Sequence, residues 1–185
     1  MKKITYIFLL WLISLNAGAT VIVSFSPSSA NVTVGDTFTV DVIADIPDPV
    51  IGWGLDISFD GSVLSLGGTP TIGGSWNSIF APDGDGLAGI APFPSTVSGS
   101  GIVLATLTFD ALTAGVTDLI ASISAGDLTE GFPLTLPGSF SPVTFINGSI
   151  VVSSASNTVP EPSIALLLIL GFAGFNVFNK NAYKA

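Results

Sequence analysis

The chain has 185 residues, of which 48% are hydrophobic and only 9% are charged, and its formal net charge is −9. Histidine and cysteine are absent, and every basic residue lies near one of the two ends: Lys2, Lys3, Lys180 and Lys184. Residues 20–159 therefore carry 12 acidic and no basic side chains. Such a body has no basic patch for nucleic acid and is repelled by an anionic membrane surface. It also lacks the histidine, cysteine and lysine of the common nucleophilic mechanisms.

Residues 1–19, MKKITYIFLLWLISLNAGA, have the layout of a secretory signal peptide. Lys2 and Lys3 form a charged start, residues 4–15 form an apolar run, and residues 17–19 form a small-residue cleavage site. The apolar run is short for a membrane span. We therefore predict an exported protein whose mature chain begins at Thr20, with an uncleaved N-terminal anchor as the alternative.

The body of the chain opens with two short predicted strands, at residues 21–25 and 31–34. Residues 35–60, GDTFTVDVIADIPDPVIGWGLDISFD, then predict two longer strands joined by a tight corner at residues 47–49, because prolines interrupt a strand ladder. Alternation places large apolar side chains on one face of each strand. These side chains are Phe38, Val40, Val42 and Ala44 in the first strand, and Ile51, Trp53, Leu55, Ile57 and Phe59 in the second. The pair must bury this face against a second sheet, so it predicts half of a sandwich core.

A further short strand is predicted at residues 63–66. Residues 67–101, rich in Gly, Ser and Pro, predict long loops with one or two short strands. Regular alternation returns in two segments. The expected inward faces are Val103, Ala105, Leu107 and Phe109 within residues 102–110, and Leu119, Ala121 and Ile123 within residues 115–123.

Residues 132–140 predict a proline-interrupted segment, and residues 145–152 predict the closing strand. About eight or nine short strands separated by turn signals favour an all-β sandwich.

Four segments in this body resemble, in order, the landmarks of a cohesin domain: VGDTFTVDV, GLDISFDGSVLSL, GIVLATLTFDAL and INGSIVV. The resemblance covers residues 21–153. It implies a jelly-roll β-sandwich of about nine strands over residues 20–153. It also implies a non-catalytic domain that binds a protein module, a dockerin, through the face of a sheet. No motif marks the residues of that face.

Residues 154–158 predict a small polar linker, after which residues 163–178 form a second apolar run. As a helix this run reaches ~24 Å, which is short of a ~30 Å hydrocarbon core unless the helix extends to Tyr183. Lys180 and Lys184 beyond it favour a cytoplasmic tail, which places the body outside.

Residues 159–185 resemble a PEP-CTERM sorting signal, and Pro160, Glu161 and Pro162 match its motif residue by residue. The resemblance implies recognition by an exosortase and a single-pass inner-membrane intermediate. It also implies display on, or release from, the surface of a Gram-negative bacterium. The tail departs from the usual arginine-rich cluster, because it offers two spaced lysines. A plain C-terminal membrane anchor is the alternative.

Paired carboxylates are the one catalytic system that the composition leaves open, as Asp83 with Asp85 or as Asp127 with Glu130. Aspartates beside glycines are usually turn residues, so we predict no catalytic residue and no enzyme activity. Residues 83–86, DGDG, resemble part of a calcium loop but lack its other oxygen ligands. We predict a turn there and no cofactor or metal site, with weak Ca²⁺ binding at Asp83 and Asp85 left open.

Two tryptophans bear on ligand binding. The alternation of Trp53 with Leu55 places it in the core, whereas Trp76 lies in the irregular region and is the candidate ligand-facing aromatic. We therefore expect a non-catalytic, surface-displayed module that binds an extracellular, dockerin-like protein and no nucleic acid. The alternatives are a carbohydrate- or exopolysaccharide-binding module and a structural component of an extracellular matrix.

Overall fold

The computed structural model describes residues 19–78, 86–124, 126–127, 129–155 and 168. The chain divides into two units, Met1–Ser154 and Ala155–Ala185. The predicted signal peptide, linker and sorting segment lie almost entirely outside the described residues. Within the described ranges, no helix has the length and apolar character of a membrane span.

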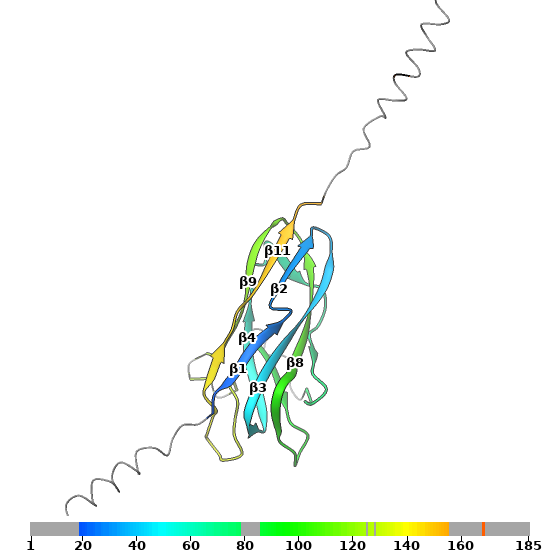
Figure 1. Cartoon of the computed structure of the whole chain (residues 1–185). Coiled ribbons are helices and arrows are strands. Elements are labelled where there is room, and N and C mark those ends of the chain that lie inside the picture. The colour runs from blue at the N-terminus through cyan, green and yellow to red at the C-terminus, as the bar shows by residue number, and fades with distance from the viewer. Residues whose placement is uncertain (1–18, 79–85, 125, 128, 156–167, 169–185) are drawn as a thin grey trace, which may run out of the picture. The chain divides into compact units, whose positions relative to one another are not determined.

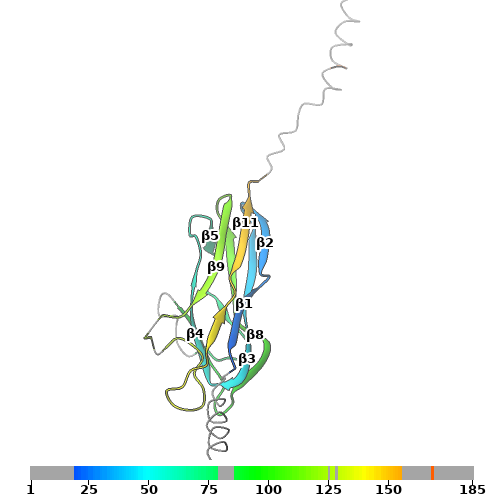
Figure 2. The same ribbon diagram turned by 60° about the vertical axis from the view of Figure 1, so that its left-hand side comes forward.

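The first unit is a sandwich of two sheets whose strands run along one long axis (Figures 1 and 2). The described residues form eleven strands, against the eight or nine predicted: β1 Val21–Ser26, β2 Ser29–Thr33, β3 Thr37–Val50, β4 Gly52–Ser58, β5 Leu64–Leu66, β6 Thr71–Ile72, β7 Gly86–Ile90, β8 Val97–Ala111, β9 Gly115–Ser122, β10 Val143–Phe145 and β11 Gly148–Ser153. The six-stranded sheet has the order β10-β1-β3-β8-β5, with β6 also paired to β8. The five-stranded sheet has the order β2-β11-β9-β4-β7.

The N-terminal strands of this unit pair with its C-terminal strands, in parallel, in both sheets. In the six-stranded sheet β1 pairs with β10, and in the five-stranded sheet β2 pairs with β11. The chain crosses between the layers after β1 and again after β10. The first and last strands therefore close the same sandwich, although they lie far apart in the sequence.

The inward faces predicted for residues 37–60 are largely confirmed, but the pairing of the two strands is wrong. Val40 and Val42 on β3 and Leu55 on β4 are fully buried, whereas Ile51 is 39% exposed. The strands β3 and β4 lie in opposite sheets, and the chain crosses the core edge at Ile51. The strands β3 and β4 bury their apolar faces in the same core from opposite sheets. The alternation of apolar and polar residues would be the same if the two strands were paired in one sheet, so it could not predict which arrangement forms.

The predicted corner at residues 47–49 lies inside the end of β3. The register between β3 and β8 shifts between Ile46 and Val50, so the prolines lie in an irregular part of the ladder. Proline is tolerated where a ladder is bulged or at an edge. Prolines in this segment therefore end regular pairing without ending the strand.

The alternation predicted for β8 is interrupted by a bulge at Leu104. Val42 pairs with Ala105 and Ile43 pairs with Val103, which leaves Leu104 as an extra residue. Leu104 and Ala105 are consequently both fully buried, and Val103 faces away from the predicted side. An extra residue of this kind reverses which side chains point inward. Ile123 also departs from prediction, because β9 ends at Ser122 and Ile123 is 42% exposed.

Candidate binding surface

The outward side of the five-stranded sheet carries exposed apolar side chains. Val116 on β9 is 64% exposed and pairs directly with Val151 on β11, which is 37% exposed. Ile120, four residues further along the same face of β9, is 39% exposed, and Asp118 lies between them. These residues form an apolar stripe with one carboxylate, which we call the β9–β11 stripe.

The outward side of the six-stranded sheet is mostly polar, and several of its carboxylates are bonded within the sheet. The Thr37 hydroxyl donates to Asp110 at 2.6 Å, and the Thr106 hydroxyl donates to Asp41 at 2.5 Å. Cross-strand threonine–carboxylate pairs of this kind stabilise the sheet. Of the two outward faces, the five-stranded one is therefore the better candidate for contact with a partner.

Residues 123–130, the 123–130 loop, interrupt the strand that pairs with β4. Before the loop, Ser122 pairs with Asp56; after it, Gly131 pairs with Gly54 through two backbone hydrogen bonds of 2.8 and 3.0 Å. Gly54 is buried even though its neighbours Trp53 and Leu55 fill the core. Thr129 and Glu130 thus lie against the outward side of Gly54.

Glycine is required at position 54 because the loop lies so close. A Cβ added there meets the carbonyl oxygen of Thr129 at 2.1 Å, a separation that real Cβ atoms do not show. The next outward position of β4 toward its start is also a glycine, Gly52, where a Cβ would lie 3.0 Å from the carbonyl oxygen of Gly89. The two glycines therefore allow neighbouring backbone to lie close to the outward side of β4.

Ser124 links two carboxylates at the edge of the loop. Its backbone N–H donates to Glu130, and its hydroxyl donates to Asp56 Oδ2 at 3.0 Å. The second oxygen, Asp56 Oδ1, is buried and has no hydrogen-bond partner within the described part of the chain. A buried acceptor without a donor is energetically costly.

The pKa values of the two carboxyl groups in this loop, Asp127 and Glu130, are shifted in opposite directions. The Ser124 N–H lowers the pKa of Glu130, but desolvation and the charges of Asp56 and Asp127 oppose it, and the net pKa lies above its ordinary value of 4.5. The hydroxyl and N–H of Thr129 hold the pKa of Asp127 below its ordinary value. Glu130 is therefore the group of this loop that most readily keeps a proton.

The structure describes one of the two candidate carboxylate pairs. Asp127 and Glu130 are brought into one loop, where they engage Thr129 and Ser124 as hydrogen-bond acceptors. Asp83 and Asp85 lie outside the described residues, and so do Pro160, Glu161 and Pro162. In the described ranges no three His, Cys, Asp or Glu residues gather as a metal ion requires.

Trp76 does not face a ligand, which corrects the expectation from the sequence. It is only 5% exposed, its Nε1 donates to the carbonyl oxygen of Val103 at 3.1 Å, and its ring packs edge-on against Trp53 at 6.3 Å. The loop that carries it folds back on β8, and this long-range contact left no signal in the local sequence. Its indole therefore belongs to the core.

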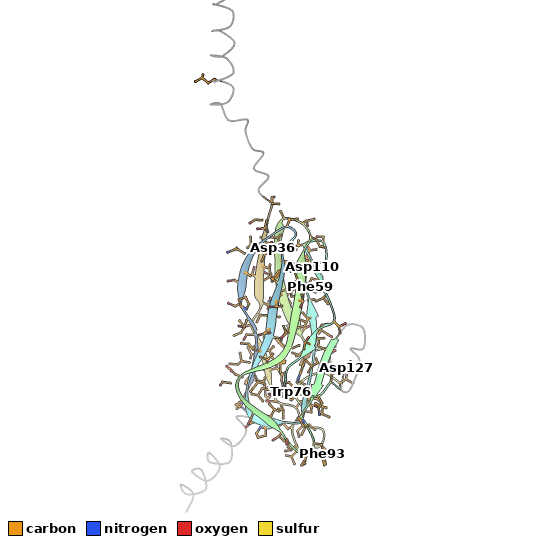
Figure 3. All side chains as sticks on the ribbon, turned by 90° about the vertical axis from the view of Figure 1, so that its right-hand side faces the viewer. Asp36, Phe59, Trp76, Phe93, Asp110 and Asp127 are labelled. Carbon is orange, nitrogen blue, oxygen red and sulfur yellow. The ribbon has the colours of Figure 1, made fainter. Side chains whose placement is uncertain are left out.

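Phe93 is the exposed aromatic that sequence reasoning missed. It is 98% exposed, and it lies at the end of the sandwich opposite Asp36 and Asp110 (Figure 3). The available signal was its position between Pro92 and Pro94, where no strand alternation carries a side chain inward. The N–H of Ser95 donates to Pro92 at 2.7 Å, which closes the turn.

Comparison with known proteins identifies the fold. No family model and no curated protein matches the chain. A solved non-cellulosomal cohesin from the archaeon Archaeoglobus fulgidus is 24% identical, with a TM-score of 0.54 over 75% of this chain and 93% of that one. A cohesin of scaffoldin B from Acetivibrio cellulolyticus, in complex with a dockerin, is 13% identical, with a TM-score of 0.55 over 73% of this chain and all of that one (100%).

A type I cohesin–dockerin complex from Clostridium thermocellum gives the same result, at 12% identity with a TM-score of 0.54 over 73% of this chain and 100% of that one. At these identities the likeness concerns the fold alone. The body of the chain has a cohesin-like β-sandwich fold, as its sequence landmarks predicted.

Proposed function

We propose that this chain is a non-catalytic, exported interaction module that binds an extracellular protein through the outward face of its five-stranded sheet. The observation that carries the proposal is the exposure of the apolar side chains of the β9–β11 stripe, of which Val116 is 64% exposed. Exposed apolar side chains rimmed by polar groups are typical of protein interaction sites. The cohesins of similar fold that were solved with dockerins support the same kind of partner.

The charge of the body defines the partner's chemistry. Residues 20–159 offer 12 carboxylates and no cation. A partner that meets this surface must supply lysine, arginine or other hydrogen-bond donors, because like charges across an interface are strongly unfavourable. The partner of the proposed module is therefore a protein with a basic, partly apolar surface.

Val116→Glu is expected to abolish protein capture while the domain stays folded. The change places a charge in the middle of the apolar stripe, but a surface substitution shifts the free energy of unfolding by only about 0.5 kcal/mol. The measurement is a pull-down with residues 20–158 as bait, against surface extract divided into protease-treated and glycosidase-treated halves. Leu66→Glu, at 44% exposure on the six-stranded sheet, is the matched control. Equal capture by both variants would contradict binding through the outward face of the five-stranded sheet.

The proposal extends to sorting, which rests on the sequence of residues 159–185 alone. Pro160, Glu161 and Pro162 would be read by an exosortase-type enzyme, after a transient single span in the inner membrane of a Gram-negative bacterium. The body would then be displayed on the surface or released. The backbone N–H of Val34 donates to Ser153 at 2.9 Å, so the sandwich ends beside Asp36, at the end opposite Phe93.

Polysaccharide binding is a second candidate, and Phe93 is the observation that favours it. An aromatic ring that is 98% exposed is available to stack on a sugar ring. Phe93→Ala is expected to weaken retention on host exopolysaccharide in affinity electrophoresis by roughly fivefold, and to leave stability within about 0.5 kcal/mol. Leu66→Ala is the control. Unchanged retention would remove Phe93 from this role and leave a structural matrix component as the third alternative.

A further inference from the structure

We propose that one end of the sandwich contacts lipid and seats the acidic body on a zwitterionic membrane surface. The exposed apolar side chains that make this contact are Ile51, Phe93, Leu136 and Phe140, and we call the surface that they form the Phe93 end. The inference goes beyond the proposed protein-binding function, because it uses other residues on another part of the sandwich. Each can therefore be tested while the other fails.

Three segments that lie far apart in the sequence meet at the Phe93 end. The chain crosses between the two sheets at Ile51, whose N–H donates to the carbonyl of Pro133 at 3.0 Å. The carbonyl of Ile51 accepts the N–H of Ala91 at 2.9 Å. The turn at residues 91–95 and the segment at residues 132–141 therefore both lie beside Ile51.

The large side chains of these segments are apolar and exposed. Phe93 is 98% exposed and Leu136 is 69% exposed, while Ile51 and Phe140 are each 39% exposed. Leu136 lies at the tip of a turn, since its carbonyl accepts the N–H of Ser139 at 3.2 Å. Apolar side chains that gather on an exposed surface mark contact with a protein or a membrane.

The Phe93 end has few charges, although the body is strongly acidic. Residues 86–109 and 131–153 contain no charged side chain. Among the described residues, Asp45 and Asp48 in the last part of β3 bring carboxylates to this end, and Asp45 accepts the N–H of Gly101 at 2.7 Å. A neutral apolar surface with carboxylates beside it suits a zwitterionic lipid surface and is repelled by an anionic one.

The direction of the chain brings an apolar segment to the same end. The Ser141 hydroxyl donates to the carbonyl of Ala19 at 3.1 Å, just before β1 begins. The start of β1 and the segment at residues 132–141 lie at one end of the sandwich (Figures 1 and 2). The apolar run of residues 4–15, part of the predicted signal peptide, therefore joins the body beside the Phe93 end. While that run is held in a membrane, this end of the body is the one nearest to the lipid.

A lipid surface fits the Phe93 end better than a folded partner does. A stable protein complex buries about 800 Å² on each partner and requires a matching shape. Four side chains on separate segments, two of them more than half covered, offer a much smaller apolar area. Partition into lipid requires no matching shape and increases with each apolar group that is buried. A second copy of the chain would also bring two acidic bodies together, which is unfavourable.

The first test is the fluorescence of Phe93→Trp in residues 20–158 as phosphatidylcholine vesicles are added. The sandwich lies within one compact unit and has its own core, and its tryptophans, Trp53 and Trp76, are buried, so the added indole is the reporter. We expect its emission to shift to shorter wavelength, and we expect the emission of Leu66→Trp, on the six-stranded sheet, to stay unchanged. An unchanged emission maximum of Phe93→Trp in excess lipid would overturn the proposal.

Vesicle cosedimentation with charged variants is the second test. Leu136→Glu is expected to lower the partition coefficient about tenfold, because a carboxylate replaces a side chain that is buried in lipid. Leu66→Glu adds the same charge elsewhere and is expected to bind like wild type. Replacing part of the phosphatidylcholine with phosphatidylglycerol is expected to weaken binding by repulsion of the carboxylates. Equal binding by the two variants, or stronger binding to the anionic vesicles, would contradict this surface.

Val116→Glu separates lipid contact from the proposed protein binding. This variant is expected to lose protein capture and to keep wild-type binding to vesicles. Vesicle binding without any protein capture would remove the protein-binding function and leave the lipid contact in place. If exopolysaccharide shifts the emission of Phe93→Trp and vesicles do not, the Phe93 end serves the polysaccharide and the lipid contact is overturned.

Discussion

Replacing Phe109 with alanine is expected to lower the free energy of unfolding by about 3–5 kcal/mol. Phe109 on β8 is fully buried, and its ring packs against Phe38 at 5.7 Å and Phe59 at 5.1 Å. The substitution removes apolar burial and leaves a cavity that rigid strands on both sides cannot close. The chain has no cysteine and hence no disulfide to compensate.

Equilibrium unfolding of residues 20–158 in urea measures this loss. Phe93→Ala is the matched control, because it is the same substitution at a side chain that is 98% exposed, and it should stay within about 0.5 kcal/mol of wild type. If Phe109→Ala behaved like Phe93→Ala, the packing of the two sheets described above would be wrong.

Gly73→Ala is expected to cost about 2–3 kcal/mol, although it adds a single methyl group. A Cβ at Gly73 would lie 2.0 Å from the carbonyl oxygen of Val103 and 2.8 Å from its carbonyl carbon, so backbone must move. Gly73 also donates its N–H to Leu104 at 2.9 Å, which holds it against the bulge of β8. The displacement reaches Trp76, because its Nε1 uses the same Val103 carbonyl.

The neighbouring glycine provides the control for this prediction. A Cβ at Gly74 has nothing within 4 Å, so Gly74→Ala is expected to leave stability within about 0.5 kcal/mol. Urea unfolding together with near-ultraviolet circular dichroism of the tryptophans compares the two variants. Similar stability and identical spectra for both would show that residues 73–76 do not pack on β8 as described.

The two halves of the five-stranded face differ in the groups they expose. The β9–β11 stripe is open and apolar around Val116, whereas on the β4 half the Thr129 carbonyl lies against Gly54.

The candidate site was only partly visible in the sequence. The pattern of residues 35–60 predicted which side chains of β3 and β4 are buried, and Asp127 with Glu130 was one of two candidate carboxylate pairs. The proximity of Asp56 to Glu130 was not predictable, because the two residues meet only after β9 and β4 pair. The burial of Trp76 and the exposure of Phe93 were not predictable for the same reason, since loop packing is decided by contacts far along the chain.

The sequence by itself determined the all-β class, the approximate order of the strands and the acidic, base-free body. Alternation at Val40, Val42 and Leu55 requires half-buried strands, and four ordered landmarks carry the resemblance to cohesins. The tertiary structure decided which sheet each strand joins, the bulge at Leu104 and the covering of Gly54 by Thr129. Alternation has a period of two whichever sheet a strand joins, whereas register and loop packing depend on residues distant in sequence.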